Sequence, residues 1–385
     1  MRKKRPCGMP TRVGCALCGA HLSKLRCPSC TTALPSERAL SKHLPICPAA
    51  RRIRKEREQP WCVPACNIYR QSVSYKQTLY SKSPLQLDEI EHVMKTVQRL
   101  LSTGKDSLAP PWVPTLPVQR SFLLEEDADI AAEWADSRNS QMKLEPKHFA
   151  QFGPLAASLL HHPPTDKLAV LELGAGRAYT SLYVAHVLHK RGLPASFVAV
   201  DRAGGRHKAD RTIRNWVDNA DSPLRTFRRI KCDVADFRIR EVDEIRTATD
   251  VRLIGKHVCG AALDASLNAA TNFAREERKG AGEVRLIFAC CCRRLCRWDW
   301  LGEAQKIWLD WGVDDKFYEV ICRLAQWGLD QKQAQEYAEI GKKCRLLLDM
   351  GRVRWLRRQG WDAYCGEYTT ASPENRCIAA VWRGV

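Results

Sequence analysis

The segment Leu168-Ala169-Val170-Leu171-Glu172-Leu173-Gly174-Ala175-Gly176 decides the fold class of this 385-residue chain. Its first six residues are apolar except for Glu172, which predicts a buried strand that leads directly into a glycine turn. The next stretch predicts a helix whose buried side carries Thr180, Val184, Val187 and Leu188. A second apolar strand, Ser196–Val200, ends at Asp201. This order predicts a βαβ unit of an α/β domain with a ligand at the glycine turn.

Two details favour S-adenosylmethionine (SAM) over a dinucleotide as that ligand. A dinucleotide fingerprint needs a third small residue at the position that Tyr179 occupies. Glu172 precedes the first glycine by two residues, and the resulting E-x-G-x-G pattern is common in SAM-dependent methyltransferases. We therefore predict a cofactor site at Glu172, Gly174 and Gly176, with Asp201 accepting the ribose hydroxyls.

The later segments complete a sheet. Asp233 directly follows a third predicted strand and is placed to meet the adenine amino group. Five parallel strands and a terminal antiparallel pair predict a class I (Rossmann-like) SAM methyltransferase domain, to which we assign residues 130–385. The later predicted strands, closing helix and terminal pair lie at 228–232, 253–255, 284–289, 337–358, 362–369 and 376–382.

Positive charge and cysteine are concentrated at the N-terminal end of the chain. Residues 1–60 hold 14 Lys and Arg against 3 Asp and Glu, so they carry +11 of the formal net charge of +19. Eight of the 18 cysteines lie between Cys7 and Cys66. Such a segment indicates a polyanionic partner, and cysteines in a reducing compartment bind metal or do chemistry more often than they form disulfides.

The composition also excludes some classes of protein. No apolar run approaches the ~18 residues of a membrane span, and the basic start at residues 1–5 has no apolar stretch behind it. We therefore expect an intracellular protein, nuclear or cytoplasmic, with no membrane contact and no obligate protein partner.

Two zinc-binding modules are predicted in the basic segment. Residues 25–50 have the ligand spacing C-x2-C-x12-H-x3-C, which suits tetrahedral Zn²⁺. The ion would supply folding free energy that so small a unit lacks. Residues 1–24 form a second module with a less diagnostic spacing. The predicted ligands are Cys27, Cys30, His43 and Cys47 in the finger, and Cys7, Cys15, Cys18 and His21 in the first module.

Three segments connect the zinc modules to the α/β domain. Residues 51–82 form a basic linker whose stretch Arg51–Lys55 either contacts phosphate or is simply solvated. Residues 83–104 predict an amphipathic helix, because apolar residues recur at intervals of three and four. Prolines predict a second linker at 105–129.

Motifs along almost the whole chain resemble those of one enzyme family. The most specific are Gly255-Lys256-His257-Val258-Cys259-Gly260 and Cys291-Cys292-Arg293-Arg294-Leu295-Cys296. The cysteine and histidine patterns of the fingers, the SAM loop at 172–176 and the segment Asp201–Asp210 also match. Together they are similar to the eukaryotic tRNA 2′-O-ribose methyltransferases that modify nucleotide 4 of the acceptor stem. The resemblance implies this activity, a tRNA substrate, and SAM and two structural zinc ions as cofactors.

Three positions depart from the family pattern. The first finger of the family takes a cysteine upstream of Cys7, so Cys15 has to substitute for it here. Cys30 stands where the second finger has a histidine, which preserves four ligands. Arg294 stands where the family has a histidine after its double cysteine, so no role is assigned to an imidazole there.

Methyl transfer to a ribose hydroxyl requires an aligned oxygen and help in removing its proton. Lys256 and His257 lie at the tip of the fourth parallel strand, where this fold presents side chains to the methyl group. We predict that His257, or a lysine kept neutral by its surroundings, removes the proton while a neighbouring cation holds a phosphate. The alternative is a histidine that only shapes the loop.

The cysteines at 290–292 and Cys296 leave three alternatives open: a nucleophile, ligands of a third metal, or packed thiols, which the family resemblance favours. Two rival functions remain beside the leading one. The chain could be a cysteine-dependent RNA cytosine-C5 methyltransferase, or a zinc-finger RNA-binding protein with an inactive methyltransferase fold.

Overall fold

The computed structural model describes residues 25–34, 36–68, 85–102, 112–115, 146–203, 208–277, 282–329 and 335–383. The chain divides into two compact units, residues 1–59 and residues 60–385. The first predicted zinc module, with Cys7, Cys15, Cys18 and His21, lies outside the described residues. Among the described residues, no helix is both long and apolar enough to cross a membrane.

The smaller unit consists of β1 (Leu25–Arg26), β2 (Ala33–Leu34), α1 (Glu37–Ile46) and α2 (Pro48–Arg57). Its two strands pair antiparallel, and Ser36 caps α1 by accepting the backbone N–H of Ala39. Neither helix contains a buried residue. The buried residues among those described in this unit are Cys27, which follows β1, and Cys47, which lies between α1 and α2. Because burial of apolar side chains contributes little here, the unit needs another source of folding free energy.

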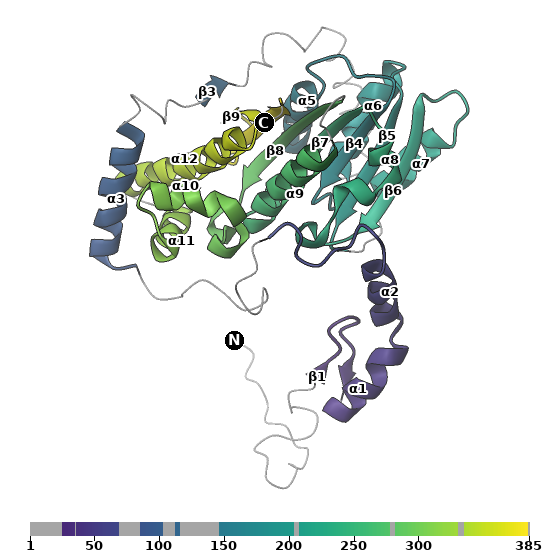
Figure 1. The fold of residues 1–385 in the computed structure, drawn as a ribbon, viewed down its shortest axis with the longest axis horizontal. Helices are drawn as coiled ribbons and strands as arrows, with labels where there is room; N and C mark the ends of the chain where they lie inside the picture. The colour runs from purple at the N-terminus through teal and green to yellow at the C-terminus, as the bar shows by residue number, and fades with distance from the viewer. Residues whose placement is uncertain are drawn as a thin grey trace. The chain divides into compact units, whose positions relative to one another are not determined.

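The larger unit is built around one eight-stranded sheet (Figure 1). Its strands are β3 (Trp112–Thr115), β4 (Leu168–Leu173), β5 (Ala195–Asp201), β6 (Leu224–Lys231), β7 (Asp250–Cys259), β8 (Glu283–Cys291), β9 (Trp361–Glu367) and β10 (Arg376–Trp382). The strand order is β3-β9-β10-β8-β7-β4-β5-β6. Strands β4 to β8 are parallel, and β10 is antiparallel to both of its neighbours. The predicted five parallel strands and terminal hairpin are confirmed.

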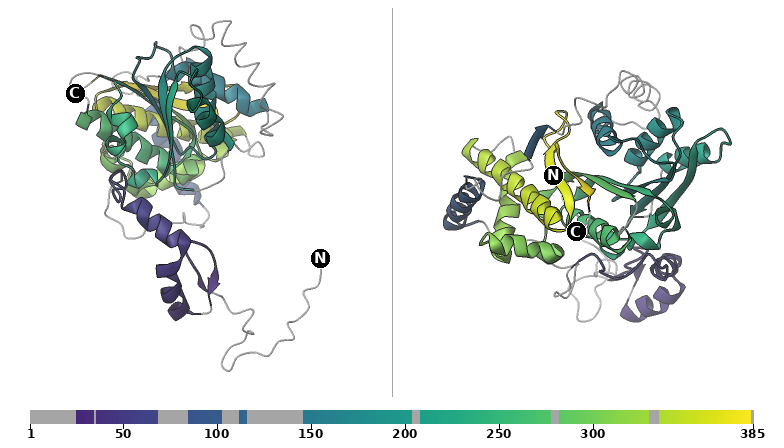
Figure 2. Two further views of the ribbon diagram at one scale, coloured as in Figure 1. Left: turned by 90° about the vertical axis from the view of Figure 1, so that its right-hand side faces the viewer. Right: turned by 45° about the horizontal axis from the view of Figure 1, so that its top comes forward.

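Helices cover both faces of this sheet, as Figures 1 and 2 show. They are α3 (Leu87–Ser102), α5 (Pro146–Leu159), α6 (Tyr179–Lys190), α7 (Lys208–Val217), α8 (Asp243–Arg246), α9 (Ala261–Glu277), α10 (Gln305–Asp310), α11 (Asp315–Leu324) and α12 (Gln335–Arg358). One apolar core packs α3, α9, α10, α11 and α12 against one face, and a second core packs α5, α6 and α7 against the other. If β4 to β10 are counted as strands 1 to 7 along the chain, their order in the sheet, read from β6 to β9, is 3-2-1-4-5-7-6. This strand order, with helices on both faces, is the class I methyltransferase fold.

Segments predicted as connections contribute to these units. Helix α2 occupies the start of the predicted basic linker 51–82. Farther along that linker, the Asn67 side chain donates to the carbonyl oxygens of Val234 and Phe237 at 2.8 and 2.7 Å, so residues 60–68 are packed within the larger unit. Strand β3 lies inside the predicted proline-rich linker and pairs parallel to β9. A short strand at a sheet edge and a single side-chain contact from a loop leave no periodic pattern in the sequence. Neither the β3 pairing nor the Asn67 contact was therefore predicted.

Candidate active site

A cavity of about 360 Å³ opens at the carboxyl ends of the central parallel strands. Its lining includes Gly174 after β4, Asp201 at the end of β5, Asp233 after β6, and Val258 and Cys259 at the end of β7. The strand order reverses at β4, with β5 on one side and β7 on the other. Ligands of open parallel sheets bind at such a reversal, because the loops on either side diverge there.

Glu172 lies beneath this cavity and does not line it. Its side chain is 2% exposed and accepts the backbone N–H of Ser181 at 3.0 Å and the Ser181 hydroxyl. Burial raises the pKa of Glu172, and the two hydrogen bonds from Ser181 oppose that shift. Glu172 therefore fixes the end of β4 to the first turn of α6, which positions the glycine turn between them.

Both predicted aspartates line the cavity and also organise its loops. Asp201 accepts the backbone N–H of Gly176 with one carboxylate oxygen, at 2.8 Å, and that of Ala203 with the other, at 2.7 Å. Asp233 accepts the N–H of Ala235 at 3.1 Å, and burial raises its pKa. Each carboxylate oxygen has a second lone pair available to a ligand hydroxyl or amino group.

A buried ion pair that the sequence patterns did not predict supports the glycine turn. Asp210 on α7 accepts two hydrogen bonds from Arg229 on β6, at 2.9 and 2.6 Å, and Arg229 also donates to the carbonyl oxygen of Gly176 at 3.1 Å. Asp210 ends the segment Asp201–Asp210 that resembles the family pattern. It is buried, because the parallel pairing of β5 and β6 brings Arg229 beside it.

Strand β7 contains a bulge at the predicted catalytic residues. Its pairing with β8 passes from Gly255 opposite Phe288 to Val258 opposite Cys290. Two residues of β7, Lys256 and His257, therefore lie opposite one residue of β8, Ala289. A bulge of this kind changes the side-chain alternation and is frequent next to active sites.

Lys256 is buried on the α5 side of the sheet. It is 8% exposed, and its Nζ atom lies 4.1 Å from the ring centroid of Phe152 on α5. Burial lowers the pKa of Lys256 to about 8, although the nearby Glu172 carboxylate raises it. Lys256 is thus a lysine whose neutral form is accessible near physiological pH. The side chain of His257 is outside the described part of the structure.

The C-terminal cysteines separate into three environments. Cys290 faces the apolar core shared with α9 and α12, and Cys296 accepts a hydrogen bond from Arg352 at 2.9 Å. Cys291 lies beside Cys259 instead, with 3.1 Å between their Sγ atoms. The hydrogen bond from Cys291 lowers the pKa of Cys259 to about 6, while that of Cys291 is raised. Neither Lys256 nor any of Cys290 to Cys292 lines the cavity.

The two signature motifs pack on each other at Gly260. This glycine has a φ of 55°, and a Cβ added to it would overlap the backbone of Leu295. Leu295 lines the cavity. Glycine is required here for the close approach as well as for the left-handed backbone conformation.

We expect Gly260→Ala to weaken SAM binding and to destabilise the protein by about 2–4 kcal/mol, because the new methyl group adds overlap to backbone strain. Gly192→Ala is the matched control, since Gly192 has a φ of 66° but a Cβ there meets nothing within 4 Å. Urea unfolding and calorimetric SAM titration measure both effects. Equal losses in the two variants would show that packing against Leu295 is unimportant.

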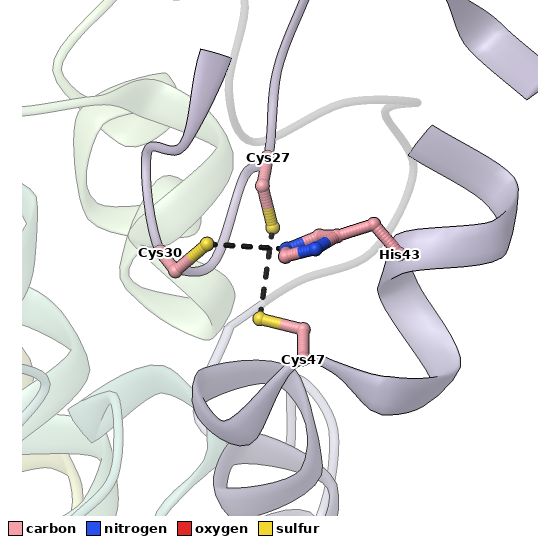
Figure 3. Close-up of side chains that lie close together, drawn as sticks. All are labelled: Cys27, Cys30, His43 and Cys47. Atoms are coloured by element: carbon pink, nitrogen blue, oxygen red, sulfur yellow. Dashed lines mark hydrogen bonds between the residues drawn. The ribbon is translucent and has the colours of Figure 1, made fainter. Parts of the chain in front are cut away.

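The four predicted finger ligands converge in the smaller unit, as Figure 3 shows. The Sγ atom of Cys30 lies 3.2 Å from Nε2 of His43, and the Sγ atoms of Cys27 and Cys47 are 3.9 Å apart. All four ligand atoms lie within 4.8 Å of one another. Hydrogen bonds from Thr32 lower the pKa of Cys30 to about 6, which favours the thiolate that a metal needs. This donor set fits Zn²⁺.

Much of this chain is similar in sequence to known tRNA-modifying proteins. Residues 155–339 match the family described as "Methyltransferase TRM13". The tRNA:m(4)X modification enzyme TRM13 of Yarrowia lipolytica is 30% identical over 314 residues, covering 69% of this chain and 64% of that enzyme. The TRM13 homolog of Mus musculus is 23% identical over 478 residues, covering 99% of this chain and 92% of that protein.

The chain therefore spans just under two thirds of the length of the Yarrowia TRM13 enzyme in that alignment. Among solved structures, the DszA carbon methyltransferase covers 92% of this chain and 74% of its own, with 14% identity and a TM-score of 0.30. A likeness at that TM-score carries no conclusion about the site.

Proposed function

We propose that this chain is a SAM-dependent tRNA methyltransferase that methylates a ribose 2′-hydroxyl of the acceptor stem, at nucleotide 4. The observation that carries the proposal is the convergence of Gly174, Asp201 and Asp233, from three successive strands, on one cavity. The TRM13 match of residues 155–339 and the tRNA-modifying relatives support the substrate class.

In this proposal the cavity holds SAM. Gly174 lets the backbone approach the ligand, Asp201 accepts its ribose hydroxyls and Asp233 its adenine amino group. Glu172 and Gly176 act through the shape of the turn, since neither lines the cavity. When bound, SAM supplies an electrophilic methyl group that an aligned oxygen displaces in line.

Lys256 is the proposed general base. In its neutral form it accepts the proton of the ribose hydroxyl as the oxygen bonds to the methyl carbon and the carbon–sulfur bond breaks toward sulfur. The resulting ammonium then releases its proton to water. The burial that lowers the pKa of Lys256 to about 8 supports this role. His257, the other predicted base, stays a candidate.

The tRNA would be bound by shape and phosphate contacts rather than by base edges. Helix α2 supports this, because all of its basic residues are exposed and none of its residues is buried. Arg202 lines the cavity and is suited to phosphates near the methyl group, whereas Arg297, which also lines it, is paired with Asp299 at 2.8 Å. Zn²⁺ is proposed for the finger at Cys27, Cys30, His43 and Cys47, and for the predicted module at Cys7, Cys15, Cys18 and His21.

The proposed reaction is tested by labelling unmodified tRNA with radioactive methyl-SAM and hydrolysing the product with alkali. A 2′-O-methyl group blocks cleavage, so we expect the label in an alkali-resistant dinucleotide that maps to nucleotide 4. Label released as a single nucleotide would contradict ribose methylation. A covalent adduct with RNA that contains 5-fluorocytosine would support the cysteine-dependent alternative instead.

A further inference from the structure

Three cysteines of the larger unit form a cluster that the proposed reaction does not use. Cys259 is the last residue of β7, Cys291 is the last residue of β8, and Cys292 follows directly. Their Sγ atoms all lie within 4.8 Å of one another. The four finger ligands meet the same limit, and this cluster is here named the thiol triad.

The backbone fixes the convergence of the thiol triad. Cys259 and Cys291 are directly paired residues of neighbouring parallel strands, so their side chains leave the sheet on the same face. The bulge in β7 sets this alternation, and it places Val258 and Cys290 on the opposite face, in the core. Cys292 has a φ of 41°, and this left-handed turn directs the chain back beside the strand ends.

Rigid neighbours hold both segments of the thiol triad in place. Gly260, which follows Cys259, packs on the backbone of Leu295. Arg293, which follows Cys292, is fully buried and donates two hydrogen bonds to Asp349, at 3.1 and 2.7 Å. Ligands carried on such supported elements are already arranged before an ion arrives, which lowers the cost of binding.

We propose that Cys259, Cys291 and Cys292 bind one Zn²⁺ ion at the wall of the cavity. Three sulfur ligands select a soft divalent ion over Mg²⁺ or Ca²⁺. The ion replaces the protons of the thiols, which pass to solvent. Three protein ligands leave a fourth position for water or for an oxygen of a bound ligand, and Cys259 itself lines the cavity. The site is separate from the finger and does not depend on the proposed methyl transfer.

The zinc content of the full-length protein tests this site without an activity assay. Zinc per chain is measured by plasma mass spectrometry for the wild type, Cys259→Ser, Cys291→Ala and Cys30→Ala. We expect Cys259→Ser and Cys291→Ala each to lose one zinc equivalent. Cys30→Ala loses one equivalent from the finger, and the Cys30→Ala/Cys291→Ala double variant loses both. Cys66→Ala, a thiol outside both clusters, is the matched control and loses none.

Cobalt substitution separates loss of a ligand from loss of the fold. Cys259 is half-buried, so Cys259→Ser keeps the size of the side chain and should retain the wild-type circular dichroism. When both variants are loaded with cobalt, the thiolate-to-cobalt absorption of Cys259→Ser is lower than that of the wild type, and the absorption of Cys66→Ala equals that of the wild type. Wild-type zinc content in both triad variants overturns the proposal, and so does a Cys259–Cys291 disulfide found in the zinc-loaded wild type.

Discussion

Replacing Lys256 with methionine should lower the rate of methyl transfer by about 10²–10⁴-fold and at the same time stabilise the protein at pH 7. The rate falls because the proposed base is lost. The stability rises because the wild type keeps a largely protonated amine in a site where it is only 8% exposed, and burial opposes that charge. Single-turnover kinetics, calorimetric SAM binding and urea unfolding measure the three quantities, and SAM affinity should change little.

The pH dependence of the same site has a definite sign. The neutral fraction of Lys256 grows as the pH rises through about 8, so the wild-type rate should rise and then level off. Between that pKa and the ordinary value of 10.5, the unfolded chain binds more protons than the folded protein. Folding stability therefore increases with pH across this window in the wild type, and Lys256→Met lacks the increase.

Lys256→Arg is the control for charge and length. Its guanidinium cannot lose a proton near neutral pH, so it should be as inactive as Lys256→Met. Substantial turnover in Lys256→Met would assign the base to another group, with His257 as the first candidate.

Asp349→Ala should destabilise the larger unit by about 3–5 kcal/mol, because it leaves buried charges without their partner. The Asp349 carboxylate on α12 is fully buried, accepts hydrogen bonds from Arg293 and Arg376 at 2.6–3.1 Å, and lies 3.7 Å from Arg352. Burial alone would raise the pKa of Asp349, but Arg293 and Arg376 lower it well below its usual value.

Asp310→Ala is the matched control on the surface. Asp310 pairs with Arg358 at 2.9 Å, but its side chain is 52% exposed, so we expect a loss below about 1 kcal/mol. Urea unfolding of the two variants gives the comparison. Because Arg293 lies two residues before Leu295, which lines the cavity, Asp349→Ala should also lower SAM affinity in the fraction that folds. Similar small losses in both variants would mean that the buried network adds little to stability.

Local sequence patterns determined the elements of this protein. The run from Leu168 to Leu173 is buried throughout, and the glycine turn after it, the hairpin after α12 and the finger ligands all lie where their spacing predicts. These features depend on contacts between near neighbours in the chain, or on repeats of two and three to four residues, so a single sequence displays them.

Only the tertiary structure decided which side chains meet across strands and layers. Glu172 is predicted from the sequence as a cofactor residue but lies under the turn, and Asp210 on α7 pairs with Arg229 on β6, which no sequence pattern indicates. The cysteine motif divides because Cys290 and Cys291 lie on opposite faces of β8, and the bulge in β7 places Cys259 opposite Cys291. Such partners are set by strand order and register, which no local pattern records. The motifs thus predicted where the site lies, and the packing of distant segments determined what each of its residues touches.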